Sequence, residues 1–318
     1  MKIGIVGAGA LGALFGQRLS AANEVVLLER KRDVVDVIRE HGLRVDGEAR
    51  PARATSEPRE LYGVQALFVF VRATDTLRAL RPFVSELSPA TAIISLQNGL
   101  GNEEAIKTSL GGTISLVIGA TTESALTVGP ADVRRIGDGT TVLGSAGASP
   151  EVVNRVVRLL TEAGFRASAA YDIRPHLWGK LIANAAINPV AALLDRPNGV
   201  VLTNEHAGDV ARSLAQEAAT VANAMRIPLP FTDPWSYVRT IVEQTAELDN
   251  SMLYDLRAGV PTEVDFINGA VAAAGRRAAV PTPYNETLAA LVKARETTRA
   301  ASRPPSGPLA AGTLLPED

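Results

Sequence analysis

The sequence has no cysteine and only three histidines among its 318 residues. Without cysteine the chain can form neither disulfide bonds nor thiolate metal sites. The histidines, His41, His176 and His206, are scattered and show no metal-ligand spacing. We therefore expect no disulfide framework and no structural metal.

The sequence also lacks an excess of charge of either sign. Lys and Arg number 32 against 34 Asp and Glu, which gives a net charge of −2. Such a chain has no basic surplus to neutralise a phosphate backbone, so we do not expect a nucleic-acid partner. It also has no run of about 18 apolar residues and no N-terminal signal segment, so we expect a cytoplasmic protein without membrane contact.

What the chain does contain is typical of a folded globular protein. Hydrophobic residues make up 46% and charged residues 21%, too apolar a composition for a disordered chain. The length predicts two domains with a substrate cleft between them. We place the domains at residues 1–171 and 172–300. Residues 301–318 are rich in Pro, Gly and Ser and are expected to form a mobile tail.

The first half alternates short apolar runs with helical patterns, which predicts an α/β domain with a doubly wound, mostly parallel sheet. Between Ala125 and Gly147 the pattern changes, and we expect short antiparallel strands at the sheet edge, with a hairpin-like turn at 137–140. A helix after Ser149 and a short strand at 167–170 would complete the domain. The expected parallel strands are Lys2–Val6, Glu24–Leu28, Ala66–Val71, Thr91–Leu96 and Thr113–Ile118.

Helical periodicity dominates the second half through about Thr298, so we expect an all-helical second domain. Breaks are expected at Pro189, Arg196–Gly199, Pro228–Pro230 and Gly259–Pro261. The apolar residues between Val201 and Val221 allow two interpretations. Packing into the protein's own core is favoured, and a homodimer surface is the alternative.

A glycine-rich turn directly follows the first strand. Gly7, Gly9 and Gly12 match G-x-G-x-x-G, with Ala8, Ala10 and Leu11 between them. In a strand-turn-helix context, the first glycine permits the tight turn, the second lets the backbone approach a pyrophosphate, and the third allows close helix packing. The helix N-terminus would offer N–H groups to the phosphates. This context predicts a Rossmann domain that binds a dinucleotide.

The end of the second strand carries both an acidic and a basic signal for the adenosine ribose. Glu29 would accept hydrogen bonds from the ribose hydroxyls and favour NAD, whereas Arg30 would pair with a 2′-phosphate and favour NADP. The neighbouring Lys31 and Arg32 strengthen the basic signal, although they could equally form a solvated face. We predict NADP as the cofactor, with NAD as the alternative.

A polar stripe lies along an otherwise apolar helix between His176 and Pro189. Lys180, Asn184 and Asn188 recur at intervals of four and share one helical face. A solvent-facing stripe is the alternative interpretation, but such faces usually carry Glu, Lys and Arg rather than Asn. When a hydride reaches a ketone carbon, the resulting alkoxide needs a positioned proton donor. Lys180 suits that role.

These segments together resemble the ketopantoate reductase (2-dehydropantoate 2-reductase) family over roughly residues 1–297. The family's known reaction is NADPH-dependent reduction of 2-dehydropantoate to (R)-pantoate in pantothenate biosynthesis, on the route to coenzyme A. The resemblance therefore implies an oxidoreductase acting on a small 2-keto acid. The matching segments are Gly7–Gly12, Leu96–Gly99, Leu177–Asn184, Asn188–Pro189, Arg196–Gly199, Ser251–Asp255 and Thr262–Gly269.

The resemblance also implies roles for individual residues. Lys180 would be the general acid, with Glu263 beside it and beside the nicotinamide ribose. Asn98 would contact cofactor and substrate, and Ala125 would lie along the cofactor. The residues implied to bind the substrate's hydroxyl and carboxylate ends are Asn184, Asn188, Asn198 and Ser251.

Without the family, several of these residues have structural interpretations that remain open. Asn98 could belong to a plain turn, Asn198 to a helix C-cap, and Ser251 to a helix N-cap. Glu263 could be a simple helix-start carboxylate, although it leads an apolar segment that must pack inward.

One residue departs from the family pattern. Arg72 follows the third strand where the family usually has Lys, which keeps the charge but changes the geometry next to the cofactor. Together with Glu29, it leaves open an NAD-linked D-2-hydroxyacid dehydrogenase for other branched or aromatic 2-keto acids. A non-catalytic dinucleotide-binding sensor is a third hypothesis.

Overall fold

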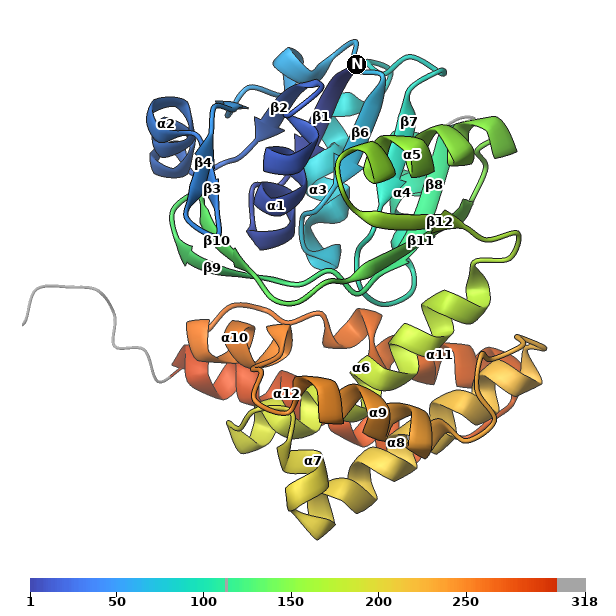
Figure 1. Ribbon diagram of the computed structural model, residues 1–318. Coiled ribbons are helices and arrows are strands. Elements are labelled where there is room, and N and C mark those ends of the chain that lie inside the picture. The colour runs from blue at the N-terminus through green and yellow to red at the C-terminus, as the bar shows by residue number, and fades with distance from the viewer. Residues whose placement is uncertain (112–113, 302–318) are drawn as a thin grey trace, which may run out of the picture.

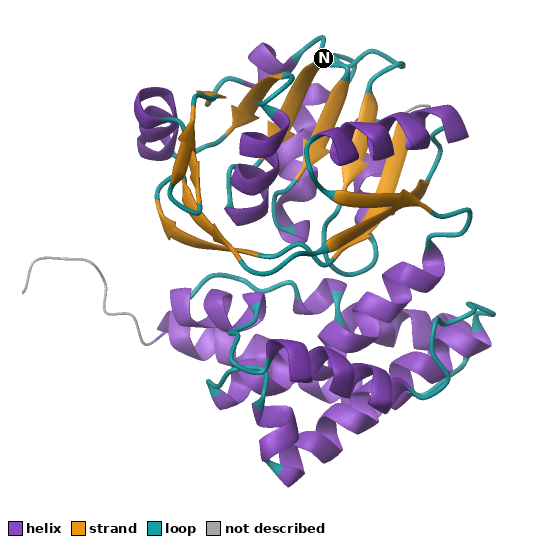
Figure 2. Cartoon of the chain, in the orientation of Figure 1, coloured by secondary structure: helices purple, strands orange, loops and turns teal. Residues whose placement is uncertain are grey.

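The computed structural model describes residues 1–111 and 114–301. The chain forms an α/β half followed by a helical half, and the two lie against each other (Figure 1). Within the described residues, the strands belong to the first half, and the second half consists of helices joined by loops (Figure 2). The predicted fold class is confirmed. Of the expected tail at 301–318, only Ala301 lies within the described residues.

The main sheet has eight strands within the described residues, in the order β12-β11-β8-β7-β6-β1-β2-β5. Neighbouring strands are parallel except β8 and β11. The connections reverse direction between β1 and β6, which opens a crevice at the carboxyl ends of the strands. The strands are β1 Lys2–Val6, β2 Glu24–Leu28, β5 Arg53–Thr55, β6 Ala66–Val69, β7 Ala92–Ser95, β8 Ser115–Thr121, β11 Thr140–Ser145 and β12 Arg166–Ala169.

Side chains along each strand alternate between two cores. In β1, Ile3 and Ile5 pack with Phe15, whereas Val6 packs on the opposite face with Leu80. Because both faces are covered by helices, the central strands β1, β6 and β7 are buried along nearly their whole length. Helices α1 (Ala10–Leu19) and α5 (Pro150–Glu162) lie on one face, and α3 (Thr76–Leu80) and α4 (Asn102–Leu110) lie on the other (Figure 1). Helix α2 spans Arg32–His41 and packs near β5.

The expectation of antiparallel edge strands between Ala125 and Gly147 was partly wrong. Strands β9 and β10 do pair antiparallel, but they leave the main sheet and join a second sheet ordered β4-β3-β10-β9. The turn at 137–139 therefore connects two sheets instead of closing a hairpin. Only β11 pairs with the main sheet, and β12 covers its outer edge. The second sheet consists of β3 Leu43–Val45, β4 Glu48–Arg50, β9 Ala125–Gly129 and β10 Asp132–Arg135.

The helical half is built around α6, which begins at Arg174 and ends at Leu194. Helix α6 is long and apolar enough to cross a membrane, but most of it is buried among the other helices. Val201 and Val221 are also buried in this core, which accounts for their apolar character without a partner. The remaining helices are α7 Val200–Thr203, α8 Glu205–Ala224, α9 Pro234–Thr245, α10 Ser251–Ala258, α11 Asn268–Ala278 and α12 Pro283–Ala301.

The expected break at Pro189 was wrong, because α6 continues through this proline. A proline inside a helix has no N–H to donate to the carbonyl four residues earlier. Here that carbonyl belongs to Ala185, and the side-chain amide of Asn268 donates to it at 3.0 Å. The buried amide thus replaces the missing helical hydrogen bond.

Substitution of two glycines of the G-x-G-x-x-G motif should affect stability to very different extents. A Cβ on Gly12 would overlap the carbonyl oxygen of Gly7, whereas a Cβ on Gly9 meets nothing within 4 Å. Gly12→Ala should therefore lower the free energy of unfolding by about 1–3 kcal/mol or more, and Gly9→Ala should change it by less than about 0.5 kcal/mol. Denaturant unfolding checks both values, and equal effects would contradict this account of the packing.

Candidate active site

Four loops at the carboxyl ends of the main-sheet strands face the helical half. They follow β1, β6, β7 and β8, on both sides of the point where the strand order reverses. In doubly wound sheets this edge is where ligands bind. Leu100, in the loop after β7, donates its N–H to the carbonyl oxygen of Phe266 at 2.9 Å and so joins this edge to the helical half.

The three glycines of the G-x-G-x-x-G motif differ in the way their sequence pattern predicts. Gly7 adopts φ +102°, a conformation that favours glycine. Gly12 lies too close to Gly7 for a side chain, and Gly9 faces open space. The first turn of α1 leaves N–H groups without helical acceptors beside Gly9. These free donors and the open approach fit a pyrophosphate.

The loop after β2 brings Glu29 against the glycine turn. Its two carboxylate oxygens accept hydrogen bonds from the N–H groups of Ala8 at 3.3 Å and Lys31 at 3.0 Å. The adjacent Arg30 is exposed and makes no hydrogen bond or ion pair with the described part of the chain. The carboxylate is therefore engaged by the backbone, while the guanidinium keeps its full donor capacity.

The polar stripe of α6 reaches this edge through Lys180. Its Nζ donates to the carbonyl oxygen of Thr121, at the end of β8, at 2.6 Å. Burial of the ammonium lowers the pKa of Lys180 to about 8, against the opposing attraction of the Glu263 carboxylate. The side chains of Asn184 and Asn188 make no hydrogen bond with any described residue, so their amides are free to receive a ligand.

Glu263 lies just before a 3₁₀ turn at Val264–Phe266 and is only 4% exposed. Its Oε1 accepts the N–H of Ala73 at 2.9 Å, and its Oε2 accepts Asn98 Nδ2 at 3.5 Å. Arg72 Nη1 lies 3.6 Å from Oε2. Glu263 therefore contacts residues from the loops after β6 and β7. The sequence predicted that Arg72, Asn98 and Glu263 belong to one site, but it did not show how they contact each other.

Asp255 completes this group, although its role was missed at the sequence level. Arg72 Nη2 donates to Asp255 Oδ1 at 2.6 Å, across the contact between the two halves. Burial raises the pKa of Asp255 to about 6, with Arg72 acting in the opposite direction and Glu263 raising it further. Asp255 stands in a matched motif, but its partner is 183 residues away, a distance that no local pattern reveals.

Asn198 and Ser251 lie near each other in the helical half, and among the described residues neither side chain hydrogen-bonds to Lys180, Asn184 or Asn188. Asn198 Oδ1 accepts Asn250 Nδ2 at 3.0 Å, and Asn198 Nδ2 donates to Thr245 Oγ1 at 3.3 Å. Asn250, not Ser251, is the N-cap of α10, and the Ser251 hydroxyl has no partner among the described residues. Asn198 thus holds the N-terminus of the helix on which Ser251 is the first residue.

Ala125, the residue expected to lie along the cofactor, is the first residue of β9. It is partly buried and packs against the core that contains α1. The segment that leads into it, Thr121–Ser124, also supplies the carbonyl that holds Lys180. Ala125 therefore lies a few residues from the lysine contact, beside the helix that follows the glycine turn.

The doubly wound sheet, its glycine turn and the lysine-bearing helix define a nicotinamide-dinucleotide-binding oxidoreductase. Two family models match the chain: ketopantoate reductase PanE/ApbA over residues 3–148, and ketopantoate reductase PanE/ApbA C terminal over residues 172–296. The chain belongs to the ketopantoate reductase family.

Similar proteins include both ketopantoate reductases and another dehydrogenase. The 2-dehydropantoate 2-reductase of Archaeoglobus fulgidus is 35% identical over 299 residues, which cover 93% of this chain and 98% of that protein. A PanE/ApbA family ketopantoate reductase from Ralstonia eutropha JMP134 has a TM-score of 0.86 at 29% identity and covers 94% and 100% of the two chains. D-mandelate dehydrogenase with NADH and anilino(oxo)acetate has a TM-score of 0.87 at 28% identity, covering 94% and 99%.

The environment of Lys180 predicts how its amine titrates. The rate of acylation by an amine reagent, followed by mass spectrometry, should rise with pH around a midpoint of about 8. Because the Glu263 carboxylate favours the ammonium, Glu263→Gln should move this midpoint to lower pH.

Lys293 is an internal control for this measurement. Its hydrogen bond to Asp265 raises its pKa above the ordinary lysine value, so its labelling midpoint should lie well above that of Lys180 and stay unchanged in Glu263→Gln. A Lys180 midpoint as high as that of Lys293 would contradict the described burial.

Proposed function

We propose that this protein reduces 2-dehydropantoate to (R)-pantoate with NADPH, as a step of pantothenate synthesis in the cytoplasm. The observation that carries the proposal is the free polar face of α6. Lys180, Asn184 and Asn188 share that face, and Lys180 reaches the sheet edge at which the glycine turn lies. The similarity to 2-dehydropantoate 2-reductases over nearly the whole chain supports this choice of substrate.

In this proposal, the bound nicotinamide supplies a hydride to the keto carbon. Lys180 donates a hydrogen bond to the keto oxygen and then transfers its proton as negative charge develops there. A pKa of about 8 suits this task, because the amine is mostly protonated at neutral pH yet releases a proton more readily than an exposed lysine. Glu263 keeps the ammonium charged and orients Asn98.

The free amides of α6 and the hydroxyl of Ser251 would hold the substrate. Asn184 and Asn188 present both donors and acceptors, which suits a hydroxyl group and a carboxylate on one small molecule. A buried polar group that pairs only with the correct substrate discriminates strongly against analogues that lack the partner. In this proposal Asn198 contributes by fixing the helix that carries Ser251.

NADPH is proposed as the cofactor because of the hydrogen bonding of Glu29 and Arg30 in the loop after β2. Arg30 is unpaired in the described part of the chain and can meet a 2′-phosphate, whereas both oxygens of Glu29 already accept backbone N–H groups. Arg72 and the N–H groups around Gly9 would approach the remainder of the dinucleotide.

An NAD-linked D-2-hydroxyacid dehydrogenase is the second candidate. Glu29 stands at the carboxyl end of β2, where a carboxylate favours an unphosphorylated ribose. D-mandelate dehydrogenase, similar in fold over nearly the whole chain, has a structure in complex with NADH. Initial rates with 2-dehydropantoate and with branched and aromatic 2-keto acids distinguish the candidates. A higher kcat/KM by about tenfold for another acid would overturn the proposed substrate.

Lys180→Ala should lower kcat for keto-acid reduction by about 10²–10⁴-fold, the usual loss for a general acid. Unchanged circular dichroism and cofactor affinity would show that the fold and dinucleotide site survive. Lys293→Ala, on the surface of α12, is the matched control and should keep full activity. A loss below about tenfold would remove Lys180 from the mechanism, and cofactor binding without turnover in the unaltered protein would favour the sensor hypothesis.

Arg30→Ala tests the choice between the two cofactors. Loss of one charge-assisted contact to the 2′-phosphate should lower kcat/KM for NADPH by about ten- to a hundredfold, with little change for NADH. Glu29→Gln is the opposing variant and should weaken the use of NADH. Equal losses for both cofactors in Arg30→Ala would contradict a role in reading the phosphate.

A further inference from the structure

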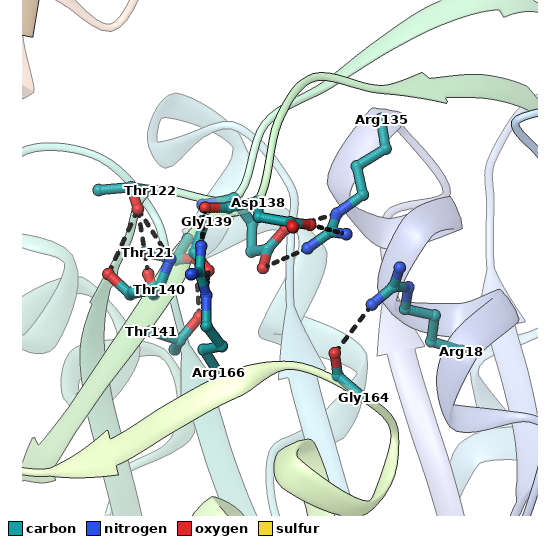
Figure 3. Close-up of polar contacts among 11 residues, drawn as sticks. Arg18, Thr121, Thr122, Arg135, Asp138, Gly139, Thr140, Thr141, Gly164 and Arg166 are labelled. Atoms are coloured by element: carbon teal, nitrogen blue, oxygen red, sulfur yellow. Dashed lines mark hydrogen bonds and ion pairs between the residues drawn. The ribbon is translucent and has the colours of Figure 1, made fainter. Parts of the chain in front are cut away.

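The segment between β8 and β9, residues Thr121–Ser124, forms the wall against which Lys180 is held. Lys180 Nζ donates to the carbonyl oxygen of Thr121. The hydroxyl of Thr121 hydrogen-bonds to that of Thr141 at 2.8 Å, and the N–H of Glu123 donates to the same Thr121 hydroxyl at 3.1 Å. Figure 3 shows Thr121 and Thr122 next to Thr140 and Thr141 of β11.

The carboxylate of Glu123 anchors the segment from the other side. Its side chain is fully buried and is paired with Arg135 of β10. The pairing is bidentate, from Arg135 Nε to Oε2 at 3.0 Å and from Nη2 to Oε1 at 3.0 Å. Arg135 also contacts Asp138, and these charges raise the pKa of its guanidinium above the usual value. The fork geometry fixes both position and orientation.

The turn that connects the two sheets closes over the same segment. A Cβ on Gly139 would overlap the backbone of Glu123, so only glycine allows this approach. The Thr122 N–H donates to the Thr140 carbonyl oxygen at 2.8 Å, and the Thr140 N–H donates to the Thr122 hydroxyl at 2.8 Å. Arg166 Nε donates to the carbonyl oxygen of Gly139 at 3.2 Å. The segment is therefore held directly by contacts from β10 and β11, and Arg166 of β12 holds the turn that closes over it.

A buried ion pair in such a place is not explained by stability alone. Removing two charges from water carries a penalty that their mutual attraction often only just offsets. Side-chain positions at a functional site, however, must be held within a fraction of an ångström by surrounding groups. Lysine needs such support more than most residues, because its long flexible stem loses much rotamer freedom when fixed.

We propose that Glu123 and Arg135 are positioning residues for the proton donor: their ion pair fixes the Thr121 carbonyl, which in turn fixes Lys180. The carbonyl stabilises the ammonium form and sets the location from which the proton is delivered. The consequence for the reaction rests on the proposed function of Lys180, but the hold on its amine does not. The same segment leads into Ala125, so the Glu123–Arg135 ion pair, here called the clamp, also fixes the first residue of β9.

The direct test is the labelling midpoint of Lys180 in Glu123→Gln. If the Thr121 carbonyl shifts away, the charged ammonium loses the hydrogen bond that it donates to this oxygen, and the midpoint should fall by about one pH unit. The alkaline limb of the pH–kcat profile should move by the same amount, with KM for the cofactor changed less than kcat. Glu24→Gln removes one partner of an exposed ion pair with Arg53 at the opposite end of the sheet and should change neither.

A second probe leaves both charges of the ion pair in place, because a mostly buried Arg135 that keeps only its contact with Asp138 is costly. Gly139→Ala should push the Glu123 backbone and shift the Lys180 midpoint in the same direction. Gly129→Ala is its control, since a Cβ there makes only an ordinary 3.7 Å contact with Asp132. If Glu123→Gln fails to fold, the double variant Glu123→Gln/Arg135→Met removes both charges of the pair.

The outcomes separate this inference from the proposed function. A folded Gly139→Ala or double variant whose Lys180 midpoint equals that of the unaltered protein would overturn the positioning role. Glu123→Asp, which keeps the carboxylate, should restore part of the midpoint and of kcat. If the unaltered protein turns over no 2-keto acid, the proposed function fails, while the labelling midpoints still decide whether the clamp positions Lys180.

Discussion

The contact between the two halves depends on one buried carboxylate. Glu263 is almost fully removed from solvent, so its charge must be met by nearby donors and cations. These come from the backbone at Ala73, from Asn98 and from Arg72, in two different loops of the sheet, while Lys180 lies near enough to be influenced electrostatically. An arrangement of the halves that moved these loops away would leave the Glu263 carboxylate buried without these partners. The charge that aligns the halves also keeps the amine of Lys180 protonated.

The features set by local pattern could be predicted from the sequence, and those set by distant contacts could not. Strands Lys2–Val6 and Glu24–Leu28 match the structure at both ends because buried parallel strands are continuous apolar runs. The three-residue strands β3, β4 and β5 were missed, since a period of two cannot be recognised over so short a run. Of these, β3 pairs with β10 and with β4, and this pairing holds β9 and β10 in the second sheet, whereas β5 pairs with β2 in the main sheet.

The candidate site shows the same division. The spacing of Lys180, Asn184 and Asn188 defines a helical face by itself, and the structure places all three on α6. The residues that position Lys180 cannot be recognised from the spacing of residues along one helix. Glu123 reads as an ordinary charge in a polar loop, and its burial depends on Arg135 from another strand. Asn198 shows the converse case, because its motif was evident but its amide is engaged by Asn250 and Thr245.

The proline within α6 has a consequence for how this helix can change. Asn268 donates both to the Ala185 carbonyl and to Asn285 Oδ1, and Asn285 donates in turn to the Leu214 carbonyl and to Glu217. A residue with an N–H at position 189 would compete for the carbonyl that Asn268 uses, and loss of Asn268 alone would leave that carbonyl unpaired in the core. The fitness of each substitution thus depends on the others. Because of this epistasis, Pro189 and Asn268 should be replaced together during evolution and not singly. This part of α6 should therefore change in sequence more slowly than other apolar helices do.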